Sequence, residues 1–261
     1  MDQDKPLVLS IDAGLATVTL NRPASLNALS RELGAQLVAT LRELRDRPEV
    51  RVVVLRGAGE RAFCTGADLK ERLTLTSAER GAHTATLAAA ADLVAALPMP
   101  TIAAVRGYAL AGGLELALAC DIRLAATDAI FGLTEVQIGI FPGAGGPVRL
   151  PRLVGPGKAR ELIFSGRRID AAEALACGLV ERVVAIEEFE QTVATLAGQI
   201  RDAAQLAVRA VKQVLNQSTE VSLPAALAYA EALRRPLDAT SDYNEGLTAF
   251  AERRKPRFTG A

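Results

Sequence analysis

The chain has 261 residues, of which half are apolar and 23% are charged, and thirty basic residues balance thirty acidic ones. High hydrophobicity with zero net charge argues against intrinsic disorder. The same balance argues against a dedicated nucleic-acid-binding protein, which normally carries a basic excess. A chain of this length buries roughly three quarters of its unfolded surface, so it can form one large core. We therefore expect one or two folded domains and no nucleic-acid partner.

The cysteine and histidine content also limits the function. Cys64, Cys120 and Cys177 are scattered and form no CxxC pair, and His83 is the only histidine. A disulfide framework or a structural zinc site is therefore not expected, and the thiols suit a reducing, cytoplasmic compartment. The N-terminal residues MDQDKPLVLS lack the pattern of a signal peptide. No run of about 18 uncharged apolar residues predicts a membrane span.

The first part of the chain alternates between strand and helix patterns, and helices dominate after Pro151. This βαβ rhythm predicts an α/β core at residues 1–195, followed by a helical part at residues 196–261. In chain order, the predicted elements are strands at 7–11 and 16–20 joined by a Gly-containing turn, a helix after the N-cap Ser30 to about 45, a buried strand at 52–55, a helix at 77–97, a strand at 101–105, a short apolar helix to 120, and strands at 122–126 and 179–184.

Two segments that follow buried strands have the composition of a ligand-binding turn. Residues 61–70 and 109–115 each place small residues where a strand turns into a helix. Small side chains let a ligand approach the backbone, and free amides at a helix start can donate to an anion. Two such amides aimed at one oxygen form an oxyanion hole. The alternative is that these glycines only permit tight turns. The Gly-rich segment 143–146 matches no dinucleotide fingerprint, so we assign it no ligand.

Two glutamates stand in unusually apolar surroundings. Glu115 comes three residues after Gly112, in the first turn of an apolar helix. An acid at such a position is either paired or functional. Glu135 lies between apolar residues, shortly before the loop 139–146. An exposed glutamate at a helix start is the alternative interpretation of Glu135. Both are candidate catalytic acids.

These segments together resemble the crotonase, or enoyl-CoA hydratase/isomerase, superfamily. The resemblance covers nearly the whole chain and rests on NRPASLNAL at 21–29, AFCTGADLKE at 62–71, PTIAAVRGYALAGGLELALACDIRLA at 100–125 and FGLTEVQIGIFPGAGGPVRLPRLVG at 131–155. It implies an α/β crotonase fold of repeated ββα turns with a C-terminal helical trimerisation region. It also implies a homotrimer, or a hexamer made of two trimers.

The resemblance assigns roles to particular residues. The backbone amides of Ala67 and Gly112 would form the oxyanion hole, and Glu115 and Glu135 would be the two acids of a hydratase. Because both positions are Glu, hydration is favoured over isomerisation. No metal and no cofactor are implied, since coenzyme A is part of the substrate. The residues that would contact the CoA substrate are Ala67, Asp68, Leu69, Lys70 and Gly112, with Phe250 and Arg253 reaching the CoA of a neighbouring subunit.

Further segments, at 66–72, 113–123, 159–167 and 245–258, resemble 3-methylglutaconyl-CoA hydratases of leucine breakdown. The predicted reaction is then the conversion of 3-methylglutaconyl-CoA to 3-hydroxy-3-methylglutaryl-CoA, or its reverse. A general short-chain enoyl-CoA hydratase of fatty-acid oxidation, a crotonase-fold isomerase and a non-enzymatic scaffold are the alternatives. The chain departs from the family pattern at Ala111, where many relatives have glycine, and at Pro147, where a polar residue is usual.

Overall fold

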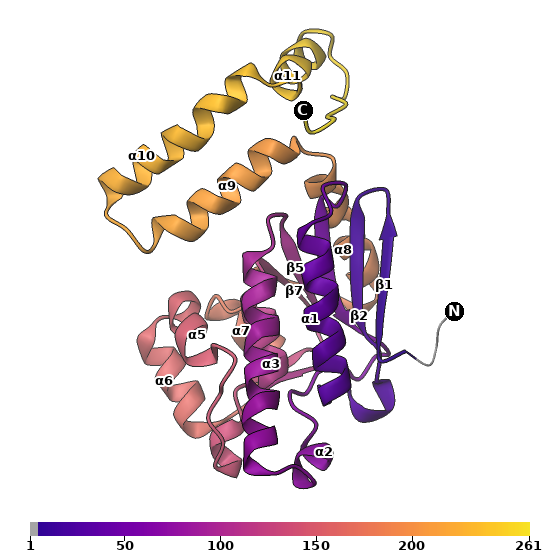
Figure 1. The fold of residues 1–261 in the computed structure, drawn as a ribbon, viewed down its shortest axis with the longest axis vertical. Helices are drawn as coiled ribbons and strands as arrows, with labels where there is room; N and C mark the ends of the chain where they lie inside the picture. The colour runs from indigo at the N-terminus through magenta and orange to yellow at the C-terminus, as the bar shows by residue number, and fades with distance from the viewer. Residues whose placement is uncertain (1–4) are drawn as a thin grey trace.

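The computed structural model describes residues 5–261, and a six-stranded sheet lies at its centre (Figure 1). The strand order is β1-β2-β3-β5-β7-β10; β1 and β2 form an antiparallel hairpin, and the other neighbours run parallel. The predicted strand at 179–184 is shortened, because Leu179 and Val180 pack into the core before the strand begins. The six strands are β1 (Leu7–Asp12), β2 (Leu15–Leu20), β3 (Val52–Gly57), β5 (Thr101–Val105), β7 (Ile122–Ala126) and β10 (Arg182–Val184).

A second, four-stranded sheet was not predicted, because its strands have only two or three residues and show no alternation that a sequence pattern could reveal. Its order is β4-β6-β8-β9. Each of β4, β6 and β8 directly follows a strand of the first sheet and precedes a helix, so the chain repeats a ββα turn. The strands are β4 (Ala62–Cys64), β6 (Tyr108–Leu110), β8 (Ile130–Gly132) and β9 (Ile169–Asp170).

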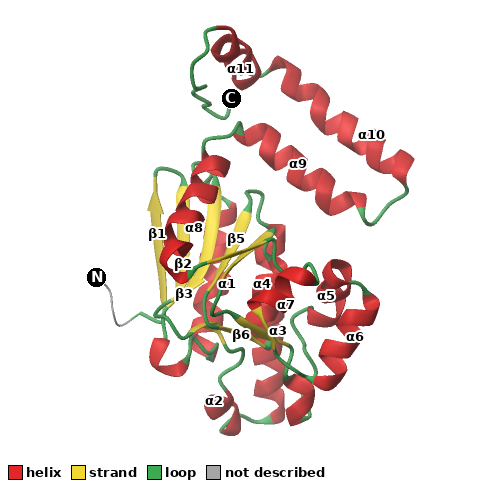
Figure 2. Cartoon of the chain, turned by 180° about the vertical axis from the view of Figure 1, so that it is seen from behind, coloured by secondary structure: helices red, strands yellow, loops and turns green. Residues whose placement is uncertain are grey.

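Helices cover both faces of the large sheet, as Figures 1 and 2 show from opposite sides. Side chains alternate along a strand, so Val53 and Leu55 of β3 join the main core with α1 (Arg31–Arg45) and α3 (Ser77–Ala96). Val52 and Val54 instead pack beneath α8 (Ile186–Arg201). The Ser30 hydroxyl accepts a hydrogen bond from the Leu33 amide, as expected for the N-cap of α1. The remaining short helices include η1 (Pro23–Ser25), α2 (Leu69–Leu73), α4 (Gly112–Ala119), η2 (Glu135–Ile138), α5 (Gly146–Val154), α6 (Pro156–Ser165) and α7 (Ala171–Ala176).

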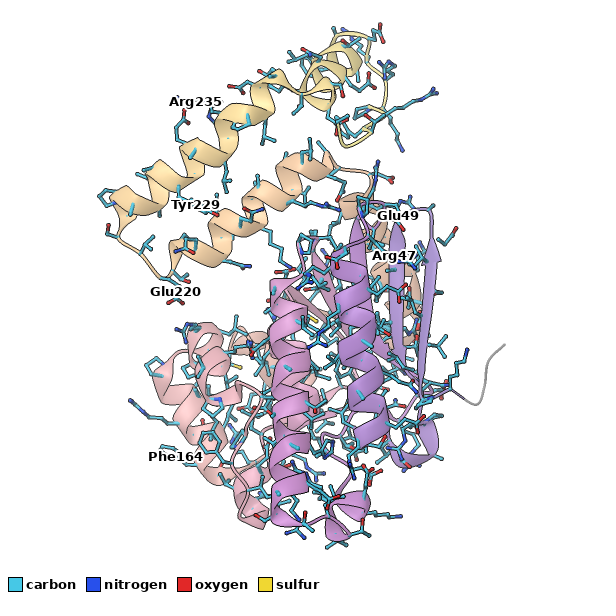
Figure 3. The ribbon with its side chains drawn as sticks, viewed as in Figure 1. Arg47, Glu49, Phe164, Glu220, Tyr229 and Arg235 are labelled. Atoms are coloured by element: carbon cyan, nitrogen blue, oxygen red, sulfur yellow. The ribbon has the colours of Figure 1, made fainter. Side chains whose placement is uncertain are left out.

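The last helices extend away from the core (Figures 1 and 2). α8 runs continuously across residues 195 and 196, where the domain boundary was predicted, because its apolar side chains remain packed on the sheet as far as Ile200. The projecting elements are α9 (Gln205–Ser218), α10 (Leu223–Arg234), η3 (Arg235–Ala239) and α11 (Ser241–Ala251). Tyr229 of α10, labelled in Figure 3, donates its hydroxyl hydrogen to Gln213 of α9 over 3.4 Å. Within residues 5–261, none of the helices has the length and apolar character needed to cross a membrane.

Buried polar contacts attach α9 to the core. The Lys212 ammonium lies 2.7 Å from an Asp121 carboxylate oxygen and donates to the Met99 carbonyl oxygen over 3.0 Å. A buried charge is tolerated when it is both paired and hydrogen-bonded. These contacts fix the direction in which the helical segment leaves the core.

Candidate active site

The turn after β4 directs one backbone amide away from the neighbouring chain segment. Leu29 donates its N–H to the Gly66 carbonyl over 2.7 Å and accepts from the Asp68 amide over 2.9 Å. Through these two bonds Leu29 pairs with Ala67 in a parallel bridge. In such a bridge the N–H of Ala67 itself points away from Leu29. No other described residue accepts a hydrogen bond from the Ala67 amide. That amide is therefore free to bind a ligand.

The turn after β6 places a second free amide beside the first. Gly112 is the first residue of α4, so its N–H has no acceptor within the helix. No described residue outside the helix accepts from it either. A Cβ atom built on Gly112 would lie 3.9 Å from the Ala67 nitrogen, so the two donors are neighbours. The pair has the arrangement of an oxyanion hole.

Glycine is required for the two turns to come this close. Gly66 has φ +85°, and a Cβ atom there would lie 2.8 Å from the Ala111 Cβ and 2.9 Å from the Gly112 nitrogen. A Cβ atom on Gly113 would lie 2.1 Å from the Cys64 carbonyl oxygen. Ala111 itself has φ +50° and ψ −129°, a strained conformation that typically costs about 1–3 kcal/mol. The surrounding turn thus forces a non-glycine residue into backbone geometry that favours glycine.

Glu115 extends from the first turn of α4 and is almost fully buried. Its Oε1 accepts hydrogen bonds from the Ala144 and Gly146 amides, both over 2.8 Å. The Gly-rich segment 143–146 therefore has a definite role, because its amides orient this carboxylate. Burial raises the pKa of Glu115 above its usual value, and the two amide bonds oppose that rise. Pro147 is compatible with this arrangement because it lies in the first turn of α5, where a missing N–H leaves no helical acceptor unsatisfied.

Glu135 is the first residue of η2 and is only 7% exposed. Its Oε2 is buried and has no hydrogen-bond partner among residues 5–261. Burial, together with the nearby Glu115 charge, raises the pKa of Glu135 to about 7. Glu135 can therefore carry a proton near neutral pH and either give it up or accept one.

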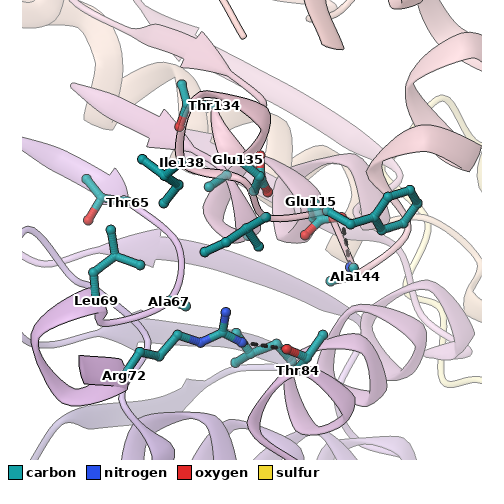
Figure 4. A pocket seen from close by; sticks show the side chains of 16 residues that line it. Thr65, Ala67, Leu69, Arg72, Thr84, Glu115, Thr134, Glu135, Ile138 and Ala144 are labelled. Atoms are coloured by element: carbon teal, nitrogen blue, oxygen red, sulfur yellow. Dashed lines mark hydrogen bonds between the residues drawn. The ribbon is translucent and has the colours of Figure 1, made fainter. Parts of the chain in front are cut away.

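One cavity joins the two amides and the two acids (Figure 4). Ala67, Gly112, Glu115 and Glu135 all line it, as does the predicted contact residue Leu69. The other walls are mainly apolar, formed by Leu87, Ile138, Ile140 and Phe141. A carbonyl oxygen bound at the amides would thus lie in the same cavity as both carboxyl groups.

Other predicted contact residues lie outside this cavity. The Asp68 carboxylate caps α2, accepting from the Lys70 amide over 3.1 Å, and forms a 2.9 Å ion pair with Arg22. The Lys70 side chain is not part of the cavity wall. Phe250 on α11 and Arg253 just beyond it are exposed on the projecting helices. Their contact with the CoA of a neighbouring subunit stays a prediction.

Arg72 and Thr84 also line the cavity but were not predicted from the sequence. An Arg72 Nη2 hydrogen is donated to the Thr84 hydroxyl, and this contact joins α2 to α3 (Figure 4). A basic residue in a short polar helix resembles any solvated side chain, so no sequence pattern distinguishes Arg72. Only the folding of α3 against α2 places the two side chains together.

Comparison with known proteins shows which family the chain resembles. Residues 10–261 match the family model described as enoyl-CoA hydratase/isomerase. The human enoyl-CoA hydratase domain-containing protein 2, mitochondrial, is 43% identical over 95% of this chain and 87% of its own length. The human methylglutaconyl-CoA hydratase, mitochondrial, is 42% identical over 95% of this chain and 74% of its own. The crystal structure of an enoyl-CoA hydratase from Bacillus anthracis is 40% identical, with a TM-score of 0.96 over 98% of this chain and all of that one.

The chain therefore belongs to the enoyl-CoA hydratase/isomerase family, within the crotonase superfamily, and has its α/β fold. The resemblance inferred from the sequence motifs is confirmed at this level. Relatives with general hydratase names and one with a methylglutaconyl-CoA hydratase name match with nearly equal identity. The comparison establishes an enzyme of this family but does not distinguish between acyl groups.

Proposed function

We propose that the protein adds water across the 2,3 double bond of a 2-enoyl-CoA thioester. The observation that carries this proposal is the single cavity that contains both glutamates and the two free amides of Ala67 and Gly112. An isomerase moves one proton between carbons and needs only one such acid. Two acids beside an oxyanion hole suit a reaction in which water loses one proton and the substrate gains another.

In the proposed mechanism the thioester oxygen binds between the Ala67 and Gly112 amides. Glu115, held by its two amide donors, removes a proton from water as the hydroxide forms a bond to C3. Electrons of the double bond move onto the thioester oxygen, where the two amides stabilise the enolate. Glu135 then delivers a proton to C2, and transfer of a proton from Glu115 to Glu135 restores the resting state. The reaction as proposed uses no metal ion or redox cofactor.

The proposed acyl group is 3-methylglutaconyl, so the product is 3-hydroxy-3-methylglutaryl-CoA. Its support is the similarity of four segments to methylglutaconyl-CoA hydratases and the 42% identity to the human protein of that name. The second candidate is a general short-chain enoyl-CoA hydratase, which the names of other relatives favour. Free thiols at Cys64, Cys120 and Cys177 are consistent with the proposed cytoplasmic location.

Hydration of crotonyl-CoA and 3-methylglutaconyl-CoA tests the proposal directly. We expect both to react, with kcat/KM for 3-methylglutaconyl-CoA at least about tenfold higher, because a charge-assisted hydrogen bond adds about 1.5–3 kcal/mol. Loss of the conjugated thioester absorbance measures the rate, and a product heavier by one water identifies hydration. Faster reaction of crotonyl-CoA would favour the general hydratase. A shifted double bond without mass gain would identify an isomerase.

The exposed apolar residues of the projecting helices support a homotrimer, or a hexamer of two trimers, as the proposed assembly. More than half of each of these side chains is exposed: Val211, Leu215, Leu223, Leu227, Leu247 and Phe250. So much apolar surface favours burial against another subunit. Sedimentation at micromolar protein should therefore give a mass of three or six chains, whereas a monomer would contradict this assembly.

A further inference from the structure

We propose that Arg72 binds a carboxylate at the far end of the acyl group, which makes the site selective for 2-enoyl-CoA thioesters that carry a second acid. This inference rests on the proposed hydratase function and adds to it the residue that selects the substrate. Its basis is the position, the hydrogen bonding and the charge of the Arg72 side chain.

Arg72 is oriented for this role by its neighbours. It belongs to α2, which begins two residues after the oxyanion donor Ala67. Its guanidinium donates from Nη2 to the Thr84 hydroxyl and, over 3.5 Å, to the Arg80 carbonyl, while Nε makes a 3.5 Å contact with His83 Nδ1. Figure 4 shows the guanidinium across the cavity from Glu115 and Glu135.

Part of the guanidinium remains available to a ligand. Nη1 donates to no acceptor in residues 5–261, although arginine has five N–H donors. Each free N–H of the guanidinium can donate a charge-assisted hydrogen bond to a carboxylate oxygen. The hydrogen bonds from Nε and Nη2 therefore hold the side chain in place and leave the Nη1 donors for a substrate.

The charge of Arg72 also lacks a protein partner. No carboxylate in the described part of the chain lies within ion-pair distance of it. Burial lowers the pKa of Arg72, and the neighbouring Arg80 charge lowers it further. A partly desolvated cation without a counter-ion is unfavourable, so binding of an anion there gains electrostatic energy.

The size of the acyl group makes a nearby cation necessary. In a glutaconyl chain the distal carboxyl carbon is only two bonds beyond C3, the atom that water attacks. The carboxylate must therefore enter the cavity that holds Glu115 and Glu135, where like charges repel it. Arg72 is the one basic side chain among the described residues lining that cavity. Arg149, which also influences Glu115, is already bound to Asp92 and to the Ala144 carbonyl.

The kinetic test compares glutaconyl-CoA with crotonyl-CoA, which has the same enoyl group without the carboxylate. We expect Arg72→Met to lower kcat/KM for glutaconyl-CoA at least about thirtyfold. The kcat/KM for crotonyl-CoA should stay within about threefold of the wild-type value. Arg72→Lys should recover part of the loss, because it retains the charge but not the fixed, planar donor geometry. Arg80→Met is the matched control, since it removes a neighbouring positive charge outside the cavity wall. It should change kcat/KM for either substrate only slightly.

A binding test keeps this inference separate from the proposed reaction. Glutaryl-CoA and butyryl-CoA have no double bond, so their Kd values, measured by calorimetry, do not depend on hydration. Wild type should bind glutaryl-CoA at least about thirtyfold more tightly than Arg72→Met, with butyryl-CoA unchanged. If Arg72→Met lost affinity equally for glutaryl-CoA and butyryl-CoA, or lost none for either, the role of Arg72 would be overturned. Selective binding of glutaryl-CoA without any hydration would instead reject the proposed reaction and retain the carboxylate site.

Discussion

Replacing either Glu115 or Glu135 with glutamine is expected to lower kcat for enoyl-CoA hydration at least about a hundredfold. An amide can neither remove a proton from water nor deliver one to carbon. Glutamine at 115 keeps an oxygen that can accept from Ala144 and Gly146, so the loop should stay in place. Steady-state kinetics with a short 2-enoyl-CoA measure the effect. Hydration by either variant at a near wild-type rate would reject the role given to that residue.

The pH dependence of the folding stability of Glu135→Gln provides an independent check on the raised pKa of Glu135. The pKa of Glu135 is about 7 in the folded protein, above its ordinary 4.5. Between these values the folded state holds a proton that the unfolded state has lost, so the free energy of unfolding falls as pH rises. The fall is about 3 kcal/mol at most, and it ends above pH 7. For Glu135→Gln, the free energy of unfolding should fall less over this pH range than it does for the wild type. Denaturant titrations at pH 5 and 8 measure the difference.

Replacing Gly66 with alanine is expected to lower kcat by about 10² to 10³, the usual effect of losing one oxyanion donor. The added Cβ would lie 2.9 Å from the Gly112 nitrogen and 2.8 Å from the Ala111 Cβ, so the second turn must move. Its amide would then no longer point at the thioester oxygen beside that of Ala67. The rate should be measured per folded molecule, with the folded fraction taken from circular dichroism.

Gly178→Ala is the matched control for this variant. Gly178 also has positive φ, +77°, but a Cβ there would approach nothing closer than the Leu153 carbonyl oxygen at 3.7 Å. It therefore introduces similar backbone strain without displacing the amide of Gly112. We expect it to lower stability and to leave kcat per folded molecule nearly unchanged. Equal kinetic losses in the two variants would show that strain, and not the position of the amide, controls the rate.

Elements with strong local signals were predictable from the sequence. The helix after Ser30 and the buried strands β3, β5 and β7 follow from N-capping and from long apolar patterns. The short strands β4, β6 and β8 were not, because they are stabilised by pairing with one another and not by any pattern of their own. Two of these short strands, β4 and β6, lead into the turns of the oxyanion hole.

The sequence by itself identified the family from its long motifs, and the same motifs named Glu115 and Glu135 as candidate acids. That Glu135 is buried and not exposed was decided only by the tertiary structure. The sequence could not assign the Gly-rich segment 143–146 as the donor to Glu115, nor place Arg72 in the cavity. Those contacts join residues that are distant in the chain or lie on separate helices. They form only when the ββα turns stack, because the packing of one turn on the next decides which amides and side chains share a cavity.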